Sequence, residues 1–417
     1  MSTKKKIILK DHRQIAQEQE LFFVHEYAPG AIFWMPKGWV IYKELAKFIR
    51  EKTEQDGYRE ISTPVMVKNA LFKKSGHWEH FGEHNMFNLA IYDSGEIKPG
   101  QTPEVNYSLK PMNCPEAALV FAHRPRSYKE LPLKLTEFGI LHRRELSGVL
   151  GGLLRVRQFV IDDAHLFVRP DQIMREIQKL LALVLDFYKS LGFEPRFYLA
   201  TKPDKAMGDP GKWEEAEKDL EEALRQAKVR YEIKEKDGAF YGPKIDTHIK
   251  DAQNRDWQLA TIQLDFMIPE RMELEYIDRE GKRQRPVMIH RGIFGSFERF
   301  IGMLIEHYQG AFPAWLSPVQ AVVIPITDRN KEYAQGITGQ LKSGGFRVEL
   351  DDRAETLQAK IRDAQLQKIP YMLVVGDKEE KQETVAVRLR TGKDLEEMKL
   401  DRIISRIKKT VEEKKDL

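Results

Sequence analysis

The chain has 417 residues, and 68 lysines and arginines against 64 aspartates and glutamates give a formal net charge of +4. That length predicts more than one domain. No apolar run approaches about 18 residues, which excludes a membrane-spanning helix, and the short apolar run near the N-terminus excludes a secretory signal. The single cysteine, Cys114, excludes an internal disulfide and favours the cytoplasm, while the nearly balanced charge permits a nucleic-acid partner without indicating one.

The first elements are a helix and an interrupted strand. Residues 39–55 place apolar side chains at helical spacing, and residues 59–66 read as a strand that contains Pro64. Because proline cannot donate to a β-ladder, we expect this strand at a sheet edge, where interfaces often form. Two β-rich runs follow at 133–146 and 153–168, and the glycines of the intervening SGVLGG predict a hairpin with a long loop.

Helices and strands then alternate irregularly. We predict helices at 171–191, 212–227 and 295–308, and strands at 230–235, 244–251, 257–266 and 272–278. Antiparallel-looking strands with helices clustered between them indicate an α+β fold. The two prolines of FPAWLSP, 312–318, predict a linker. Beyond it, alternating strands and helices predict a small α/β domain, so we divide the chain into domains 1–313 and 314–417.

Charged side chains gather on the predicted hairpin. Alternate residues of a strand share a face, which groups Arg143 with Glu145 and, on the second strand, Arg155, Arg157, Phe159, Asp163 and His165. Such a surface could hold a phosphate, the edge of a base and the face of a base together. An ion-paired solvent face is the alternative, and spacing alone favours it.

Two other sets of residues are ambiguous by themselves. Cys114, His165 and His290 are of types that bind zinc, but they are far apart and follow no CxxC or HExxH spacing, so a buried core cysteine is the favoured alternative. Arg299 lies in the first turns of a predicted helix, near N–H groups that attract anions, but an ordinary surface arginine is as good an interpretation. The common phosphate-binding loops, GxxxxGK[ST] and strand-linked GxGxxG, are absent from the sequence.

Several motifs together carry a resemblance that no single one does. In chain order they are LKPMNCPEA, EFGILHRRE with RVRQF, DDAHLF, GAFYGPKID, TIQLDF, MIHRGIFGSFERF and KIPYMLVVGD. From about residue 10 to its C-terminus the chain resembles the threonyl-tRNA synthetases, which are class II aminoacyl-tRNA synthetases. The resemblance implies an antiparallel sheet flanked by helices, a C-terminal anticodon-binding domain, a homodimer formed around Pro64, and a cytoplasmic enzyme.

The resemblance also implies a role for each ambiguous residue. Arg143 would contact the α-phosphate of ATP, Glu145 the adenine edge, Phe159 the adenine face and Arg299 the opposite side of ATP, which replaces the solvent-face interpretation. Arg155 and Gln258 would complete the ATP site, Mg²⁺ would accompany ATP, and Arg143 and Arg299 would be catalytic. In the C-terminal domain, Glu379 and Arg388 match anticodon-contacting positions.

Cys114, His165 and His290 match the family's zinc ligands, and three protein ligands leave zinc open to substrate. Threonine would chelate the ion through its amino and hydroxyl groups, and Asp163 would accept a hydrogen bond from that hydroxyl. Valine, nearly isosteric, lacks the oxygen and would be rejected. Further pocket positions are Met112, Tyr241, Lys244 and Gln263, and His77 matches a histidine that would assist transfer to tRNA(Thr).

The chain departs from the family pattern at Glu116, Ala117, Ile161, Leu259 and Ala354, and we expect altered kinetics, inhibitor response or tRNA preference. Full-length members carry an editing domain before the core, whereas this sequence begins at the core. Serine differs from threonine by one methyl group, worth about 1–3 kcal/mol, so we expect this chain to mischarge serine. The alternatives are a regulatory synthetase-like protein and an enzyme that loads a carrier other than tRNA.

Overall fold

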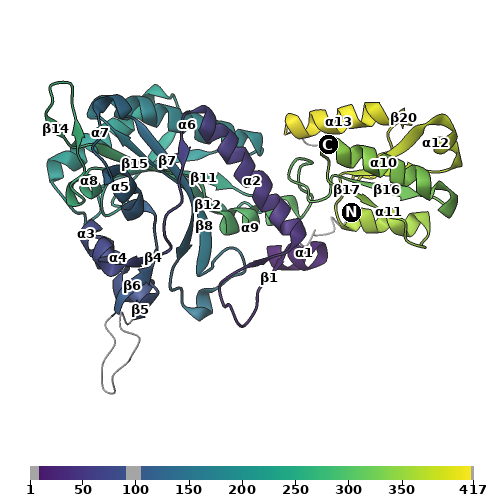
Figure 1. Cartoon of the computed structure of the whole chain (residues 1–417), viewed down its shortest axis with the longest axis horizontal. Helices are drawn as coiled ribbons and strands as arrows, with labels where there is room; N and C mark the ends of the chain where they lie inside the picture. Colours follow the sequence, from purple (N-terminus) through teal and green to yellow (C-terminus); the bar gives the residue numbers. More distant parts are fainter. Residues whose placement is uncertain (1–8, 91–104, 415–417) are drawn as a thin grey trace, which may run out of the picture. The chain divides into compact units, whose positions relative to one another are not determined.

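The computed structural model describes residues 9–90 and 105–414 (Figure 1). The chain forms two compact units, each built from segments that are separate in sequence. The larger unit contains His25–Ile32 and Arg50–Phe300, and the smaller contains the residues up to Val24, Phe33–Ile49 and those from Ile301 onward. Within the described ranges, no helix is both long and apolar enough to cross a membrane.

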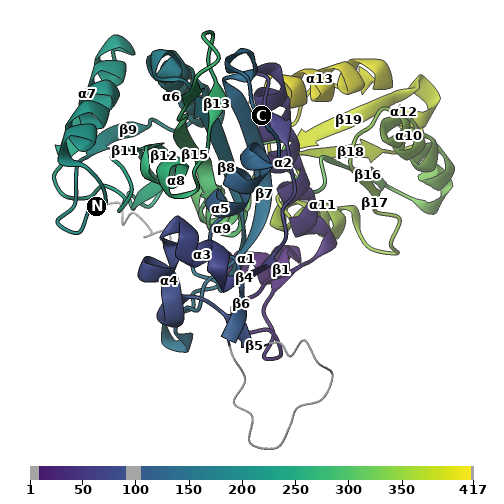
Figure 2. The same ribbon diagram turned by 60° about the vertical axis from the view of Figure 1, so that its left-hand side comes forward.

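An eight-stranded sheet is the centre of the larger unit (Figure 2). Its inner pairings are antiparallel, whereas the edge pairs β10–β9 and β3–β7 are parallel. In order across the sheet, the strands are β10 (Tyr231–Lys234), β9 (Arg196–Ala200), β11 (Lys244–Lys250), β12 (Asp256–Asp265), β15 (Val287–Ser296), β8 (Gln158–Val168), β7 (Leu133–His142) and β3 (Arg59–Glu60).

Helices α6 (Ile173–Ser190) and α7 (Pro210–Gln226) pack against each other and against strands of this sheet. Helix α6 repeats apolar residues at spacings of three and four, and that face is buried. It ends beside Tyr188, whose hydroxyl donates to the carbonyl of Ile293 over 2.7 Å and so joins the helix to β15. The sheet strands that carry the candidate site are therefore held from behind by a packed helical layer.

The larger unit also contains a smaller sheet and several short elements. Strands β4 (Met66–Lys68), β6 (Val105–Leu109) and β5 (Asn88–Ala90) form a three-stranded sheet. Other helices of the larger unit are α3 (Asn69–Ser75), α4 (His77–Asn85), α5 (Cys114–Ala122) and α8 (Met267–Arg271), and β13 (Tyr276–Ile277) pairs with β14 (Arg283–Gln284). Helix α9 (Phe297–Tyr308) begins in the larger unit, and its residues from Ile301 onward belong to the smaller one. Helix α5 contacts β8 and α8, which places its first residue beside the large sheet.

The smaller unit has a five-stranded sheet between helices. Alternate residues of β16 (Ala321–Pro325) belong to different cores, because Ala321 and Val323 lie in one apolar cluster and Val322 and Ile324 in the other. Both faces of the sheet are therefore covered. The order is β17 (Val348–Leu350), β16, β18 (Tyr371–Val375), β19 (Thr384–Leu389) and β20 (Met398–Lys399), with helices α10 (Lys331–Ser343), α11 (Leu357–Leu366), α12 (Asp377–Gln382) and α13 (Leu400–Glu412).

Segments from the beginning of the chain complete the smaller unit. They are α1 (His12–Gln19), the pair β1 (Phe22–Phe23) and β2 (Phe33–Trp34), and the first part of α2 (Pro36–Gln55). The predicted linker, 312–318, is packed here rather than exposed, since Trp315 is buried and meets Phe48 edge-on with ring centroids 5.4 Å apart. The predicted boundary between 313 and 314 remains a prediction.

The predicted α+β class is confirmed, but some strands differ from prediction. Residues 59–66 do not form one strand: β3 stops at Glu60 and β4 begins at Met66, because proline interrupts the ladder between them. β3 does lie at the edge of the large sheet, as expected. In the predicted strand 272–278, only Tyr276–Ile277 is a strand.

Candidate functional site

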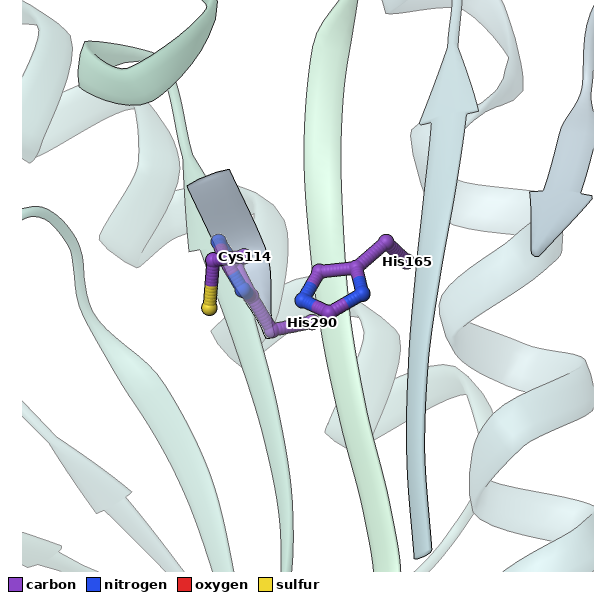
Figure 3. A group of neighbouring side chains, drawn as sticks. All are labelled: Cys114, His165 and His290. Atoms are coloured by element: carbon purple, nitrogen blue, oxygen red, sulfur yellow. The ribbon is translucent and has the colours of Figure 1, made fainter. Parts of the chain in front are cut away.

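Three residues distant in sequence meet at the large sheet (Figure 3). Cys114 is the first residue of α5, and His165 on β8 is the register partner of His290 on β15. Side chains of register partners on neighbouring strands emerge on the same face, which brings the two imidazoles together with ring centroids 5.0 Å apart. One ligand atom from each of the three residues lies within 4.8 Å of the others.

The chemistry of these residues fits a metal ion. All three side chains are buried, and Nε2 of His290 is 2.8 Å from the carboxylate oxygen Oδ2 of Asp265. That contact requires the proton on Nε2 and leaves Nδ1 as a lone pair. Among the described residues, neither Nδ1 of His290 nor Nε2 of His165 has a hydrogen-bond partner. Two unpartnered imidazole nitrogens beside a thiol can together hold a metal ion.

Burial sets the protonation of this group. It raises the pKa of the Cys114 thiol well above its usual value, and the nearby carboxylates of Asp163 and Asp265 add to that effect. It lowers the pKa of His165 well below its usual value, with His290 contributing. Neutral imidazoles are ready to donate lone pairs, whereas the thiol must lose its proton to become a ligand, so metal binding by this group releases a proton.

The two neighbouring acids of β8 have different surroundings. Asp162 is fully buried, 2.5 Å from the guanidinium of Arg291, and it accepts the Ile293 amide over 2.8 Å, so its contacts are with the protein itself and its role is structural. Asp163 lies on the same face of β8 as His165. Its Oδ2 accepts a hydrogen bond from Nδ2 of Asn113 over 3.1 Å. Burial raises the pKa of Asp163 to about 6, partly opposed by that hydrogen bond.

A cavity of about 370 Å³ adjoins the metal-ligating group. It brings together most of the predicted amino-acid pocket, with the hydroxyl of Tyr241 donating to Oε1 of Gln263 in its wall. The predicted metal ligands and amino-acid pocket residues that line it are Met112, Cys114, Asp163, Tyr241, Gln263 and His290. Carboxylate, amide and hydroxyl groups thus surround the cavity next to the possible ion, which suits a small polar ligand.

A second cavity, of about 360 Å³, contains all six predicted ATP residues, namely Arg143, Glu145, Arg155, Phe159, Gln258 and Arg299. The guanidinium carbon of Arg143 lies 5.2 Å from the centre of the Phe159 ring, and Glu145 pairs with Arg155 over 2.9 Å. Arg143, Gln258 and Arg299 line both cavities, so the two spaces share walls. A ligand with an anionic centre between a planar ring and a polar head would fit across them.

The strand-parity explanation of this cluster was wrong in detail. β7 ends at His142 and β8 begins at Gln158, so Arg143, Glu145 and Arg155 lie in the connection rather than on paired strands. Arg157 does not line either cavity, because its guanidinium donates to the carbonyl of Glu145 over 2.9 Å and to Ser147 over 3.1 Å. Packing of the connection, not strand alternation, gathers the charges.

Five predicted residues lie outside the cavity linings. One is His165, described above as part of the metal-ligating group, and the other four are Lys244, His77, Glu379 and Arg388. Lys244 is held by Asp246 over 2.5 Å. His77 is buried with Nδ1 2.9 Å from the hydroxyl of Ser75, and burial lowers its pKa to about 3. Glu379 and Arg388 belong to the smaller unit, where Glu379 accepts the Gly376 amide and Arg388 pairs with Asp394, both over 2.9 Å.

The site also contains residues that sequence reasoning did not assign. Asn113 and Asp265 contact predicted residues directly, and each had a sequence signal: Asn113 precedes Cys114, and Asp265 has the strand parity of Gln263. Of the departures from the family pattern, Ile161 and Leu259 line both cavities. Glu116 is buried without a hydrogen-bond partner among the described residues, and burial raises its pKa to about 8.

Comparisons with known proteins agree with this geometry. Residues 98–308 match the family model "tRNA synthetase class II core domain (G, H, P, S and T)", and residues 320–410 match "Anticodon binding domain". A structure of the RNA-binding domain of threonyl-tRNA synthetase from Cryptosporidium parvum is 40% identical, with a TM-score of 0.90 over 96% of this chain and 98% of that one. The chain belongs to the threonyl-tRNA synthetase family.

Other family members extend the comparison. A structure described as a putative threonyl-tRNA synthetase from Aeropyrum pernix gives a TM-score of 0.82 at 28% identity, covering 97% of each chain. Threonine–tRNA ligases from Carboxydothermus hydrogenoformans and Caldanaerobacter subterraneus are each 50% identical, over 97% and 96% of this chain. This synthetase-family chain spans 62% and 61% of their respective lengths.

Proposed function

We propose that the chain is a threonine–tRNA ligase that activates L-threonine with ATP and transfers the threonyl group to tRNA(Thr). The observation that carries this proposal is the shared wall between two cavities. One contains cationic and aromatic groups suited to a nucleotide, and the other adjoins a metal-ligating group and Asp163. The 50% identity to threonine–tRNA ligases supports the choice of amino acid.

We propose Zn²⁺ as the ion held by Cys114, His165 and His290, since one thiolate and two imidazoles form a donor set typical of zinc sites with an open position. Bound Zn²⁺ would act as a Lewis acid toward the amino and hydroxyl groups of threonine. Asp163 would then accept a hydrogen bond from that hydroxyl. Valine cannot make either contact through its side chain, so these residues would select threonine over its isostere.

In the activation step, a carboxylate oxygen of threonine attacks the α-phosphorus of ATP and the bond to pyrophosphate breaks. Arg143 and Arg299, which line both cavities, would offset the negative charge that develops at that phosphorus, together with Mg²⁺ brought by ATP. Phe159 would stack on adenine while Glu145 accepts from its amino group. Glu145 would have to exchange its contact with Arg155 for that one.

In the transfer step, a hydroxyl of the terminal ribose of tRNA attacks the carbonyl carbon of the adenylate and AMP leaves. We assign His77 to the surroundings of that ribose. Its low pKa, about 3, keeps the imidazole neutral at pH 7 and makes it a hydrogen-bond acceptor rather than an efficient base. Glu379 and Arg388 would contact the anticodon from the smaller unit.

We further propose that the chain works in the cytoplasm as a homodimer joined near Pro64. The support is the edge position of β3, which leaves one side of a strand available for a partner just before that proline. Sedimentation of the purified chain should give twice the chain mass. A single chain mass at micromolar concentration would contradict the dimer.

The decisive experiment measures ATP–pyrophosphate exchange and then tRNA charging by the Zn²⁺-loaded chain. Threonine should support exchange with a much higher kcat/KM than valine, and tRNA(Thr) should accept the threonyl group. Absence of threonine-dependent exchange would exclude a ligase and favour a regulatory synthetase-like protein. Exchange without charging would instead favour an enzyme that loads another carrier.

A further inference from the structure

Asn113 occupies an unusual position for an asparagine at the start of a helix. It is the residue before α5, where asparagine commonly accepts a backbone N–H with its side chain, yet its side chain makes no such bond. The residue is fully buried, and its amide nitrogen instead donates to Oδ2 of Asp163 over 3.1 Å. The helix thus loses a cap that would stabilise it, and the amide is directed at the cavity wall.

The donor in this contact is fixed by chemistry. An ionised carboxylate only accepts hydrogen bonds, so the nitrogen of the amide must face Asp163 and its oxygen must face away. That oxygen, Oδ1 of Asn113, has no hydrogen-bond partner among the described residues. Leaving a buried amide oxygen unpartnered is unfavourable, so the position of Asn113 is not explained by the needs of the fold alone.

Gly139 on β7 provides the space for this amide. A Cβ atom at Gly139 would overlap both Oδ1 and Nδ2 of Asn113, so the amide lies directly against the glycine backbone. The φ angle of Gly139 is not positive, so it is the space, not the backbone conformation, that calls for glycine here. Strand β7 pairs with β8, where Glu137 is opposite Asp163 and Gly139 is opposite Ile161. Gly139 therefore lies two residues along β7 from the position opposite Asp163.

The contact leaves one oxygen of Asp163 for a ligand. Oδ2 is taken by Asn113, and no described residue donates to Oδ1. Asp163 lines the cavity that also contains Cys114 and His290. A carboxylate held through one oxygen presents the other in a fixed direction. Sites become selective when neighbouring residues hold the ligand-contacting side chains in place in this way.

We propose that Asn113, with the space provided by Gly139, is a positioning residue that aims Oδ1 of Asp163 at the hydroxyl of the amino acid bound beside Cys114, His165 and His290. The inference rests on the proposed function. It adds a residue that never touches the substrate but sets how strongly the site prefers a hydroxylated amino acid over its isostere. Gly139 and Asn113 act through one contact.

The test compares full-length N113A, G139A and the double variant, all loaded with Zn²⁺. Calorimetry measures binding of L-threonine and L-valine, and ATP–pyrophosphate exchange gives kcat/KM for each and KM for ATP. We expect the preference for threonine over valine, measured as the ratio of the binding constants and as the ratio of the kcat/KM values, to fall about tenfold in N113A and in G139A. That size is expected for a lost hydrogen bond to a charged group. The double variant should fall no further than N113A, because the clash disappears with the side chain.

A purely structural role would give other results. N69A is the matched control, since Asn69 is also a buried asparagine and accepts from Ser108 over 2.6 Å, and its ratio should stay that of the wild type. Zn²⁺ content and KM for ATP should be unchanged in every variant. An unchanged ratio in N113A, equal losses for both amino acids, loss of Zn²⁺, or additive losses in the double variant would each overturn the proposal.

The binding measurement separates this inference from the proposed activity. If the wild-type chain binds threonine in preference to valine but catalyses no exchange, the ligase proposal fails and the binding ratios still decide the role of Asn113. If the wild-type chain shows no preference in binding, the role of Asn113 is overturned with it. G139A keeps every polar group of the site, so it gives an answer even if N113A does not fold.

Discussion

A single hydrogen bond determines what His290 can do. An imidazole has one proton when neutral, and the carboxylate of Asp265 fixes that proton on Nε2 over 2.8 Å. The other oxygen of Asp265 accepts the amides of Met267 and Ile268 over 2.7 and 3.0 Å, which anchors the carboxylate at the start of α8. The chain therefore positions His290 from the end of β12, two strand residues beyond Gln263.

D265N should weaken Zn²⁺ binding by about 10- to 100-fold. The new amide can donate to Nε2 of His290, which moves the imidazole proton to Nδ1, where the lone pair is needed. Competition with a chromogenic chelator measures the affinity. D278N is the control, because Asp278 accepts two backbone amides over 2.9 Å in a turn away from the metal-ligating group. Equal affinities of D265N and the wild type would refute the role of Asp265.

Glu298 should make stability depend on pH. Its carboxyl is buried and accepts the Val160 amide over 3.1 Å, and burial raises its pKa from 4.5 to about 8. Between these values the unfolded chain releases the proton and the folded chain keeps it, so stability is lost as pH rises from about 4.5 to about 8. Between pH 5.5 and 7.5, the free energy of unfolding measured in urea should fall by roughly 2–3 kcal/mol more for the wild type than for E298Q. Parallel curves for the two proteins would contradict this.

At the scale of elements, periodicity predicted those helices and strands whose apolar residues repeat regularly along the chain. Helices α6 and α7 and strands β11 and β12 were predicted within a few residues because their apolar patterns are regular. β15 was not predicted as a strand: it is buried along most of its length between β12 and β8, so its sequence has no polar alternation. The two ends of the connection between β7 and β8, residues 143–146 and 153–157, were predicted as strand, whereas tertiary contacts shape them and only its middle, 147–152, was predicted as a loop.

Close approach between elements could not be read from spacing either. In α2, a Cβ atom at Gly38 would overlap the carbonyl oxygen of Leu21, whereas one at Gly336 in α10 would meet nothing within 4 Å. G38A should therefore destabilise the smaller unit by about 1–3 kcal/mol through overpacking. G336A, its matched control in another helix, should stabilise by about 0.5–1 kcal/mol because alanine favours helix. Thermal unfolding measures both effects, and a change of melting temperature in the same direction for the two variants would refute this explanation.

At the scale of the whole molecule, the two compact units are interleaved along the chain. The consecutive domains 1–313 and 314–417 stay a prediction. Contacts within the smaller unit explain the interleaving. His12 lies 2.6 Å from Glu306, and Arg347 pairs with Glu44 over 2.8 Å, which joins residues about 300 positions apart. The periodic patterns of a sequence are local and do not predict contacts between residues so far apart. Motif order predicted residues of the candidate site, whereas the contacts of Asn113 with Asp163 and of Asp265 with His290 appear only in three dimensions.

The division into units predicts a separation of the two proposed steps. All residues that line the two cavities belong to the larger unit, and Arg388 belongs to β19 of the smaller one. R388A should lower kcat/KM for tRNA(Thr) about tenfold in a charging assay, as expected for a lost arginine–base contact. Threonine-dependent exchange, which needs only ATP and threonine, should remain at the wild-type rate.

The control for this separation is K342A, since Lys342 is an exposed cation at the end of α10 in the same unit. Both variants remove one positive charge, so a general electrostatic effect on tRNA would lower charging equally and would vanish in high salt. A contact specific to Arg388 would instead leave K342A near the wild type and persist as a difference between the two variants at every salt concentration. Loss of exchange in R388A would show that the smaller unit affects activation itself, and the separation of steps would then be wrong.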